Sequence, residues 1–162
     1  MKTALIVVDI QNDYFPGGRL TLENSEQALS AALDAIAQAK QAGEVVIGIQ
    51  HFTPSDGPFL AKGTVGAELH PAIAEALNGC VVIEKQQADS FLGTPLGQTL
   101  AAQNVSDICL VGMMTQHCIT HTALSPEAAG LDVTILGAGC AAPTALISDI
   151  ALSGLAGRCK VV

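Results

Sequence analysis

Short apolar runs alternate with longer amphipathic stretches along the whole chain. The apolar runs cover residues 4–8, 45–49, 81–83, 107–111 and 132–136, with a shorter sixth at 160–162. Unbroken apolar runs of this length are typical of strands that are buried on both faces, as in a parallel sheet. The pattern therefore predicts a parallel sheet of roughly six strands.

The stretches between these runs have helical spacing. Residues 25–42 repeat alanine, leucine and isoleucine every three or four positions and end at Gly43. Further helices are predicted over 68–77, 94–103, 115–129 and 144–155. Pro126 lies inside the helix predicted over 115–129 and should kink or shorten it. Strand and helix alternate from end to end, which predicts an α/β three-layer sandwich forming one domain over 1–162.

Three apolar runs lead directly into a reactive side chain. Asp9 ends the first run and Lys85 ends the third, while Cys118 follows the fourth in Gly112-Met113-Met114-Thr115-Gln116-His117-Cys118. The carboxyl ends of parallel strands meet at one edge of the sheet, where ligands bind. An acid, a cation and a thiol at that edge predict an active site with a cysteine nucleophile.

A cysteine attacks as the thiolate, and three features are expected to favour that form. Cys118 lies in the first turn of a predicted helix, Lys85 supplies a positive charge, and Asp9 can accept the thiol proton. Backbone N–H groups at the same helix start, those of Cys118 and of Met114 or Thr115, can stabilise an oxyanion. These parts suit acyl transfer from an amide, ureido or carbamoyl group through a thioester.

Four other side chains are expected near this edge. Gln11, two residues after Asp9, can orient the substrate or Lys85, and His51 can touch the substrate. Phe15 and Phe91 are candidate apolar walls of the pocket, with packing in the core as the alternative. A glycine- and proline-rich loop over 52–66 follows the second strand and should cover the same edge.

His117 and His121 allow several interpretations. A Cys–His nucleophile pair is one, although adjacent residues on a helix point in different directions. A zinc site formed by His117, His121 and Cys118 is another, but no second cluster has a matching spacing. The plain alternative is two partly exposed or interfacial histidines.

The composition and the net charge of the chain disfavour several classes of protein. The residues are 49% hydrophobic and 14% charged, so part of the apolar surface is expected in a subunit interface of a homodimer or homotetramer. A net charge of −8 disfavours nucleic-acid binding, and the apolar runs are too short to cross a membrane. No leader peptide is apparent, which suggests the cytoplasm. Five irregularly spaced cysteines do not predict a disulfide framework, and no nucleotide-binding glycine motif is present.

Several pieces of the sequence, in this order, resemble one family. They are residues 4–15, His51-Phe52-Thr53-Pro54, residues 63–71, Lys85 with residues 90–94, and residues 112–118. The chain resembles the isochorismatase-like cysteine hydrolases, which include nicotinamidases and N-carbamoylsarcosine amidohydrolases. The resemblance implies a catalytic triad of Asp9, Lys85 and Cys118, a six-stranded parallel sheet, and a cis peptide between Met113 and Met114.

The sequence departs from the nicotinamidase pattern at two places. Nicotinamidases hold a metal with an Asp-x-His pattern after the second strand, where this chain reads Gln50-His51-Phe52. The chain is more similar to the branch that lacks metal, so neither a metal nor another cofactor is expected. Gln116 stands where relatives carry an acid, Asn or His, and we expect it to contact the substrate.

The sequence thus predicts a metal-independent cysteine hydrolase for a small-molecule amide, ureido or carbamoyl substrate. Two alternatives stay open. One is a catalytically silent binding or scaffold protein on the same fold, motivated by the altered helix after Cys118. The other is an isochorismate-type vinyl ether hydrolase, to which a thiol nucleophile is less suited because a vinyl ether needs protonation.

Overall fold

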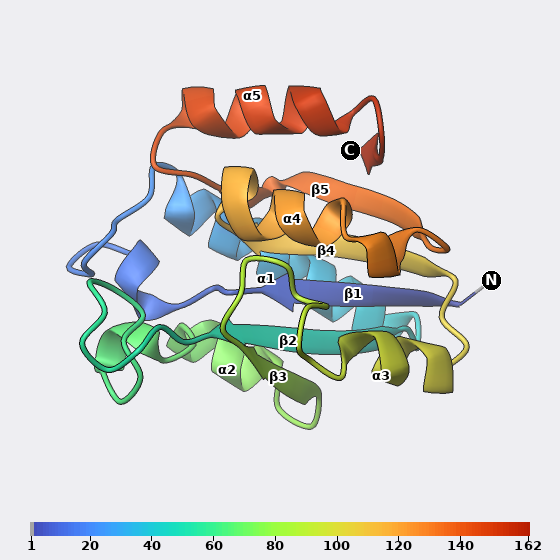
Figure 1. The fold of residues 1–162 in the computed structure, drawn as a ribbon, viewed down its shortest axis with the longest axis horizontal. Coiled ribbons are helices and arrows are strands. Elements are labelled where there is room, and N and C mark those ends of the chain that lie inside the picture. Colours follow the sequence, from blue (N-terminus) through green and yellow to red (C-terminus); the bar gives the residue numbers. More distant parts are fainter. Residues whose placement is uncertain (1) are drawn as a thin grey trace.

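A computed structural model describes residues 2–162, which form a parallel sheet flanked by helices (Figure 1). Within these residues the sheet has six strands in the order β3-β2-β1-β4-β5-β6. The strands are β1 Thr3–Val8, β2 Val45–His51, β3 Val81–Lys85, β4 Asp107–Met113, β5 Asp132–Ala141 and β6 Lys160–Val161. All of their pairings are parallel, so the predicted α/β sandwich with a six-stranded parallel sheet is confirmed.

The side chains of the central strand β1 belong to two hydrophobic clusters, one on each face of the sheet. Ala4, Ile6 and Val8 belong to the cluster that includes residues of α3 and of the turn after β4. Leu5 and Val7 belong to the other, which includes most of the buried face of α1. Alternate side chains of a strand point to opposite faces, which is why one unbroken apolar run fills both layers.

The helices cover both faces of the sheet. They are α1 Ser25–Gln41, α2 Pro71–Ala76, α3 Leu96–Ala102, α4 Thr120–Ala123 and α5 Ala145–Leu155. Helix α1 lies behind the sheet in Figure 1, whereas α3, α4 and α5 lie in front of it or at its upper rim. The sandwich therefore has the layers that the alternation of strand and helix predicts.

Two predicted helices are shorter than expected. The helix predicted over 68–77 begins at Pro71, because a residue that precedes proline is disfavoured in helical geometry. His70 caps it instead, its ring accepting the N–H of Ala72 at 3.3 Å. The helix predicted over 94–103 begins at Leu96.

The helix predicted over 115–129 is wrong as a single element. The chain forms a π-turn over Thr115–Ile119, the single α-turn α4, and a separate 3-10 turn over Pro126–Ala128. Ser125 is extended, with ψ 138°, and its hydroxyl accepts the N–H of Glu127 at 3.3 Å. Pro126 lacks the N–H that a continuous helix needs, so the expected shortening is confirmed.

Helix α5 buries a polar side chain and exposes apolar ones. The Ser148 hydroxyl lies 2.8 Å from that of Thr115, while Leu146 and Ile150 are 67% and 63% exposed. These two lie one turn apart on the outer face. Such a face is consistent with a subunit interface, and the homodimer or homotetramer stays a prediction. Among residues 2–162, no helix combines the length and the apolar character needed to span a membrane.

Gly112 lies one residue before the end of β4, the strand that leads to the cysteine turn, and only glycine fits there. Its φ is +129°, and a Cβ would collide with the backbone oxygen of Val8 on the neighbouring strand. We expect Gly112→Ala to lower the free energy of unfolding by at least about 2 kcal/mol, through overpacking and backbone strain. Urea denaturation followed by circular dichroism measures this.

Gly130→Ala is the matched control, because a Cβ there meets nothing within 4 Å. Its unfolding free energy should stay within about 0.5 kcal/mol of the unsubstituted protein. Equal urea midpoints for the two variants would contradict the packing argument.

Candidate active site

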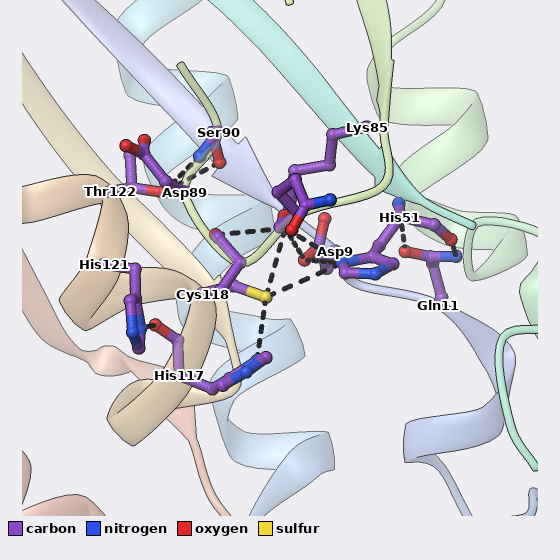
Figure 2. A network of polar contacts seen from close by, with 12 residues as sticks. Asp9, Gln11, His51, Lys85, Asp89, Ser90, His117, Cys118, His121 and Thr122 are labelled. Atoms are coloured by element: carbon purple, nitrogen blue, oxygen red, sulfur yellow. Dashed lines mark hydrogen bonds and ion pairs between the residues drawn. The ribbon is translucent and has the colours of Figure 1, made fainter. Parts of the chain in front are cut away.

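The strand order brings four functional side chains to one edge of the sheet (Figure 2). His51 and Lys85 are the last residues of β2 and β3 and are partners in register. Asp9 follows β1, and Cys118 lies in the π-turn after β4. These four strands are consecutive neighbours in the sheet, so their carboxyl ends converge, as the sequence predicts for Asp9, Lys85 and Cys118.

Asp9 turns into the site through an unusual backbone conformation. Its φ is +51°, in the left-handed region that aspartate tolerates better than most residues. Its N–H donates to the carbonyl of Ile49 at 3.0 Å, which ties the turn to β2. The side chain is fully buried. A carboxylate removed from water in this way needs a positive partner.

Lys85 provides that partner. Its Nζ lies near Asp9 Oδ2 at 2.8 Å, Gln87 O at 2.9 Å, His51 Nδ1 at 3.0 Å, Cys118 Sγ at 3.1 Å and Ala88 O at 3.3 Å. Burial lowers the pKa of the Lys85 ammonium, but Asp9 and Cys118 together outweigh burial and raise it. Lys85 therefore stays charged at neutral pH and neutralises Asp9.

The Cys118 thiol is buried, with only 1% of the residue exposed. Burial and the Asp9 carboxylate raise its pKa, while Lys85 acts in the opposite direction without reversing the shift. The expected acidifying effect of Lys85 is present, but burial beside a carboxylate outweighs it, so the net direction is opposite to the one expected from the sequence. Because the pKa of the thiol is raised, we expect deprotonation to accompany attack.

His51 lies closer to the reacting groups than a substrate-contact role requires. Its Nδ1 is 3.0 Å from Lys85 Nζ, 3.7 Å from Asp9 Oδ2 and 3.8 Å from Cys118 Sγ. An ammonium only donates hydrogen bonds, so Nδ1 is the acceptor in the contact with Lys85. His51 is therefore a member of the polar cluster that Asp9, Lys85 and Cys118 form.

Gln11 holds His51 in place. Its Nε2 donates to the carbonyls of His51 at 2.8 Å and Ala67 at 2.7 Å, and its Oε1 accepts the N–H of His51 at 2.8 Å. The side chain is fully buried. Its amide thus fixes the end of β2 against the loop that contains Ala67. Orientation of the substrate by Gln11, expected from the sequence, stays a prediction.

His117 approaches the sulfur from a direction different from that of Lys85 (Figure 2). Its Nδ1 lies 3.5 Å from Cys118 Sγ. Adjacent residues of an α-helix diverge by about 100°. The wider π-turn reduces this divergence, so the sequence-based argument against a close approach of the two side chains is wrong.

The other predicted substrate contacts have no hydrogen bond to Asp9, Lys85 or Cys118 in the described chain. Phe91 is buried in the same hydrophobic cluster as Cys118, and Phe15 stacks on His70 with ring centroids 4.5 Å apart. Gln116 lines a groove between α4 and α5 of about 440 Å³, and its Oε1 is buried without a hydrogen-bond partner in the described chain. The peptide between Met113 and Met114 is cis, as the resemblance implies. The oxyanion role of the Met114 and Cys118 N–H groups stays a prediction.

Three potential metal ligands, from Asp9, His51 and Cys118, lie within 4.8 Å of one another. Lys85 Nζ stands 2.8 to 3.1 Å from the nearest atom of each of them. A fixed ammonium at that position already supplies the positive charge and repels a divalent ion. These residues therefore do not fit a metal centre.

Thr122 and Ser90 form a buried link that the sequence analysis did not select. The Thr122 Oγ1 accepts the N–H of Ser90 at 3.0 Å and donates to its hydroxyl at 2.8 Å. This ties α4 to the loop whose Gln87 and Ala88 carbonyls accept from Lys85. Two hydroxyl residues 32 positions apart carry no signal in one sequence that pairs them.

The ion pair predicts a large stability effect. Lys85→Met keeps an unbranched side chain one atom shorter than lysine but leaves the Asp9 carboxylate buried without its cation. We expect the free energy of unfolding to fall by about 3–5 kcal/mol, measured by urea denaturation. Lys62→Met breaks the exposed pair with Glu84, at 3.3 Å, and should cost less than about 1 kcal/mol. Similar losses in both variants would refute the buried-pair argument.

The raised pKa of the Cys118 thiol predicts how its reactivity depends on Asp9. The Asp9 carboxylate raises this pKa, so Asp9→Asn should lower it and increase the thiolate fraction at a given pH. We expect alkylation of Cys118 by iodoacetamide at pH 7.5 to become about tenfold faster, because the thiolate is the form that reacts. Peptide mass spectrometry follows the reaction, with Cys159 in the same molecule as the internal control. An unchanged or slower rate at Cys118 would be incompatible with the assigned direction.

Comparison with known proteins places the chain in a family. Residues 3–162 match the Isochorismatase domain. The chain is 35% identical over 150 residues to the isochorismatase family protein YddQ of Bacillus subtilis, covering 92% of this chain and 83% of that protein. It is 28% identical over 154 residues to the nicotinamidase/pyrazinamidase of Mycobacterium tuberculosis, covering 82% and 83% of the two chains.

Comparison with solved structures also finds related proteins. The crystal structure of a nicotinamidase from Bacillus subtilis superimposes with a TM-score of 0.91 at 24% identity, covering 100% of this chain and 99% of the other. That identity supports the fold alone. Together with the domain match over nearly the whole chain, it leads to one conclusion: this protein is a member of the isochorismatase family of hydrolases.

Proposed function

We propose that this protein is a metal-independent cysteine hydrolase that cleaves a small amide, ureido or carbamoyl compound through a thioester. The observation that carries the proposal is the buried Lys85 ammonium, which lies 3.1 Å from Cys118 Sγ and 2.8 Å from Asp9 Oδ2. A nucleophile, a base and a charge stabiliser are then in mutual contact. The M. tuberculosis relative, described as a nicotinamidase/pyrazinamidase, supports an amide as the substrate class.

In the first half of the proposed reaction, Cys118 attacks the carbonyl carbon. The thiol is protonated at rest, so its proton passes to Asp9 as the S–C bond forms, and Lys85 stabilises the developing thiolate. The oxyanion of the tetrahedral intermediate is stabilised by backbone N–H groups at Met114 and Cys118. Asp9 then returns the proton to the leaving nitrogen as the C–N bond breaks.

In the second half, water cleaves the thioester. Water loses a proton as its oxygen bonds to the carbonyl carbon, the C–S bond breaks with its electron pair on sulfur, and Lys85 makes the sulfur a better leaving group. The proton from water passes to the sulfur, the acid product departs, and the Cys118 thiol is restored. No step requires a metal, in keeping with the ammonium that lies among Asp9, His51 and Cys118.

The proposal is tested with a panel of small amides, ureido and carbamoyl compounds, with isochorismate alongside. The wild type should hydrolyse at least one compound with a C–N bond, and Cys118→Ala should lose at least about a thousandfold in kcat/KM. Cys159→Ala, at a half-buried thiol, should retain the activity. Circular dichroism checks that both variants are folded.

Other outcomes separate the alternatives. Retained turnover in Cys118→Ala would refute the cysteine mechanism. Turnover of isochorismate alone would favour the vinyl ether hydrolase, and a wild type inert toward the whole panel would favour the silent scaffold.

A further inference from the structure

The sulfur of Cys118 has a protein side and a solvent side. On the protein side are Asp9, Lys85 and His51, with 0%, 2% and 8% of each residue exposed. His117 also contacts the sulfur, at 3.5 Å, and is an exposed residue. His117 is therefore the exposed neighbour of the sulfur, whereas Asp9, Lys85 and His51 are buried.

Backbone and side-chain contacts hold His117 in the turn. The N–H of His117 donates to the carbonyl of Met114 at 3.0 Å, and the N–H of Ile119 donates to the same carbonyl at 3.3 Å, which closes the π-turn. The carbonyl of His117 accepts from His121 Nδ1 at 2.8 Å, and the two rings meet edge to face with centroids 5.4 Å apart. The peptide of His117 is therefore held on both sides, and its ring packs against that of His121.

We propose that His117 is a further catalytic residue of the proposed hydrolase, acting as the general base for the water that cleaves the thioester. The inference rests on the proposed function, because it needs an acyl group on Cys118. The carbonyl carbon of that group is one covalent bond from the sulfur, so a water molecule held by His117 Nδ1 lies beside it. The ring can then orient and deprotonate this water.

The proton and electron balance of this step is simple. Water loses a proton to Nδ1 as its oxygen bonds to the carbonyl carbon, and the C–S bond breaks with its electron pair staying on sulfur. The thiolate leaves toward Lys85, and the imidazolium returns its proton to the sulfur across the 3.5 Å contact. The acid product is released and the resting thiol is restored.

The buried groups are less suited to this role. Asp9 Oδ2 and His51 Nδ1 lie 2.8 Å and 3.0 Å from Lys85 Nζ. Asp9 Oδ1 has no hydrogen-bond partner in the described chain, but Asp9 and His51 are both buried, whereas His117 is exposed to solvent.

The charges around His117 favour its basic form. Five titratable groups surround it: Cys118 in the same turn at 3.5 Å, His121 on α4, Lys85 on β3, His51 on β2 and Asp9 after β1. Burial, His121, Lys85 and His51 lower the pKa of His117, and Asp9 opposes them without reversing the shift. The neutral ring therefore predominates at neutral pH, as a general base requires.

The test uses 4-nitrophenyl acetate, an activated ester that acylates thiols, on the full-length protein. The wild type should release a burst of nitrophenolate equal to one acetyl group on Cys118, followed by slower turnover. His117→Asn keeps an amide near the position of Nδ1 but removes the base. It should retain the burst, slow deacylation about a hundredfold at pH 7.5 and accumulate the acetyl-enzyme, detected by intact mass.

The pH profile of deacylation separates catalysis from a structural role. In the wild type the deacylation rate should fall as the pH drops through the pKa of His117, which gives the pH profile an acidic limb. In His117→Asn this acidic limb should be absent. His121→Asn is the matched control: it removes a group that lowers the pKa of His117, so the limb should remain and move to higher pH.

The outcomes that contradict the inference differ from those that contradict the proposed function. A normal burst with equal deacylation rates in the wild type and His117→Asn would overturn the role of His117 and leave the hydrolase proposal standing. A wild type without a burst above that of Cys118→Ala would overturn both.

Discussion

A buried positive charge organises the functional edge of this protein. Removing an ammonium and a carboxylate from water costs several kcal/mol per ion, and only close pairing recovers that cost. The Lys85–Asp9 contact at 2.8 Å therefore constrains everything around it. The ends of β1 and β3 must be held at a fixed separation, with β2 between them, and the loop carbonyls of Gln87 and Ala88 must turn inward to meet the remaining ammonium protons.

Much of the surrounding polar structure serves that arrangement. Gln11 holds the backbone of His51, and the ring of His51 accepts from Lys85. Thr122 binds Ser90 and thereby connects the loop after β3 to the helix after the cysteine. These contacts explain why so many polar side chains are buried at one end of an otherwise apolar sheet.

The turn after β4 gives the cysteine its particular surroundings. A regular helix from Thr115 onward would carry His117 away from the sulfur, whereas the π-turn brings its Nδ1 to 3.5 Å. The sulfur consequently lies between the buried charged groups of Asp9 and Lys85 and the exposed imidazole of His117. This division suits a reaction in two stages, with the first proton transfer on the protein side and water arriving on the other.

The sequence by itself determined the architecture and the three converging groups. Apolar runs of strand length require a sheet buried on both faces, and parallel strands align their carboxyl ends, so Asp9, Lys85 and Cys118 had to share an edge. Pro126 likewise had to interrupt a helix, since a missing N–H acts locally. The tertiary structure alone decided the strand order, the place of His51 inside the ion-pair cluster and the contact between His117 and the sulfur. It also decided the direction in which the pKa of the thiol moves. Each of these depends on distances between segments far apart in the chain or on the depth of burial, and periodicity carries neither quantity.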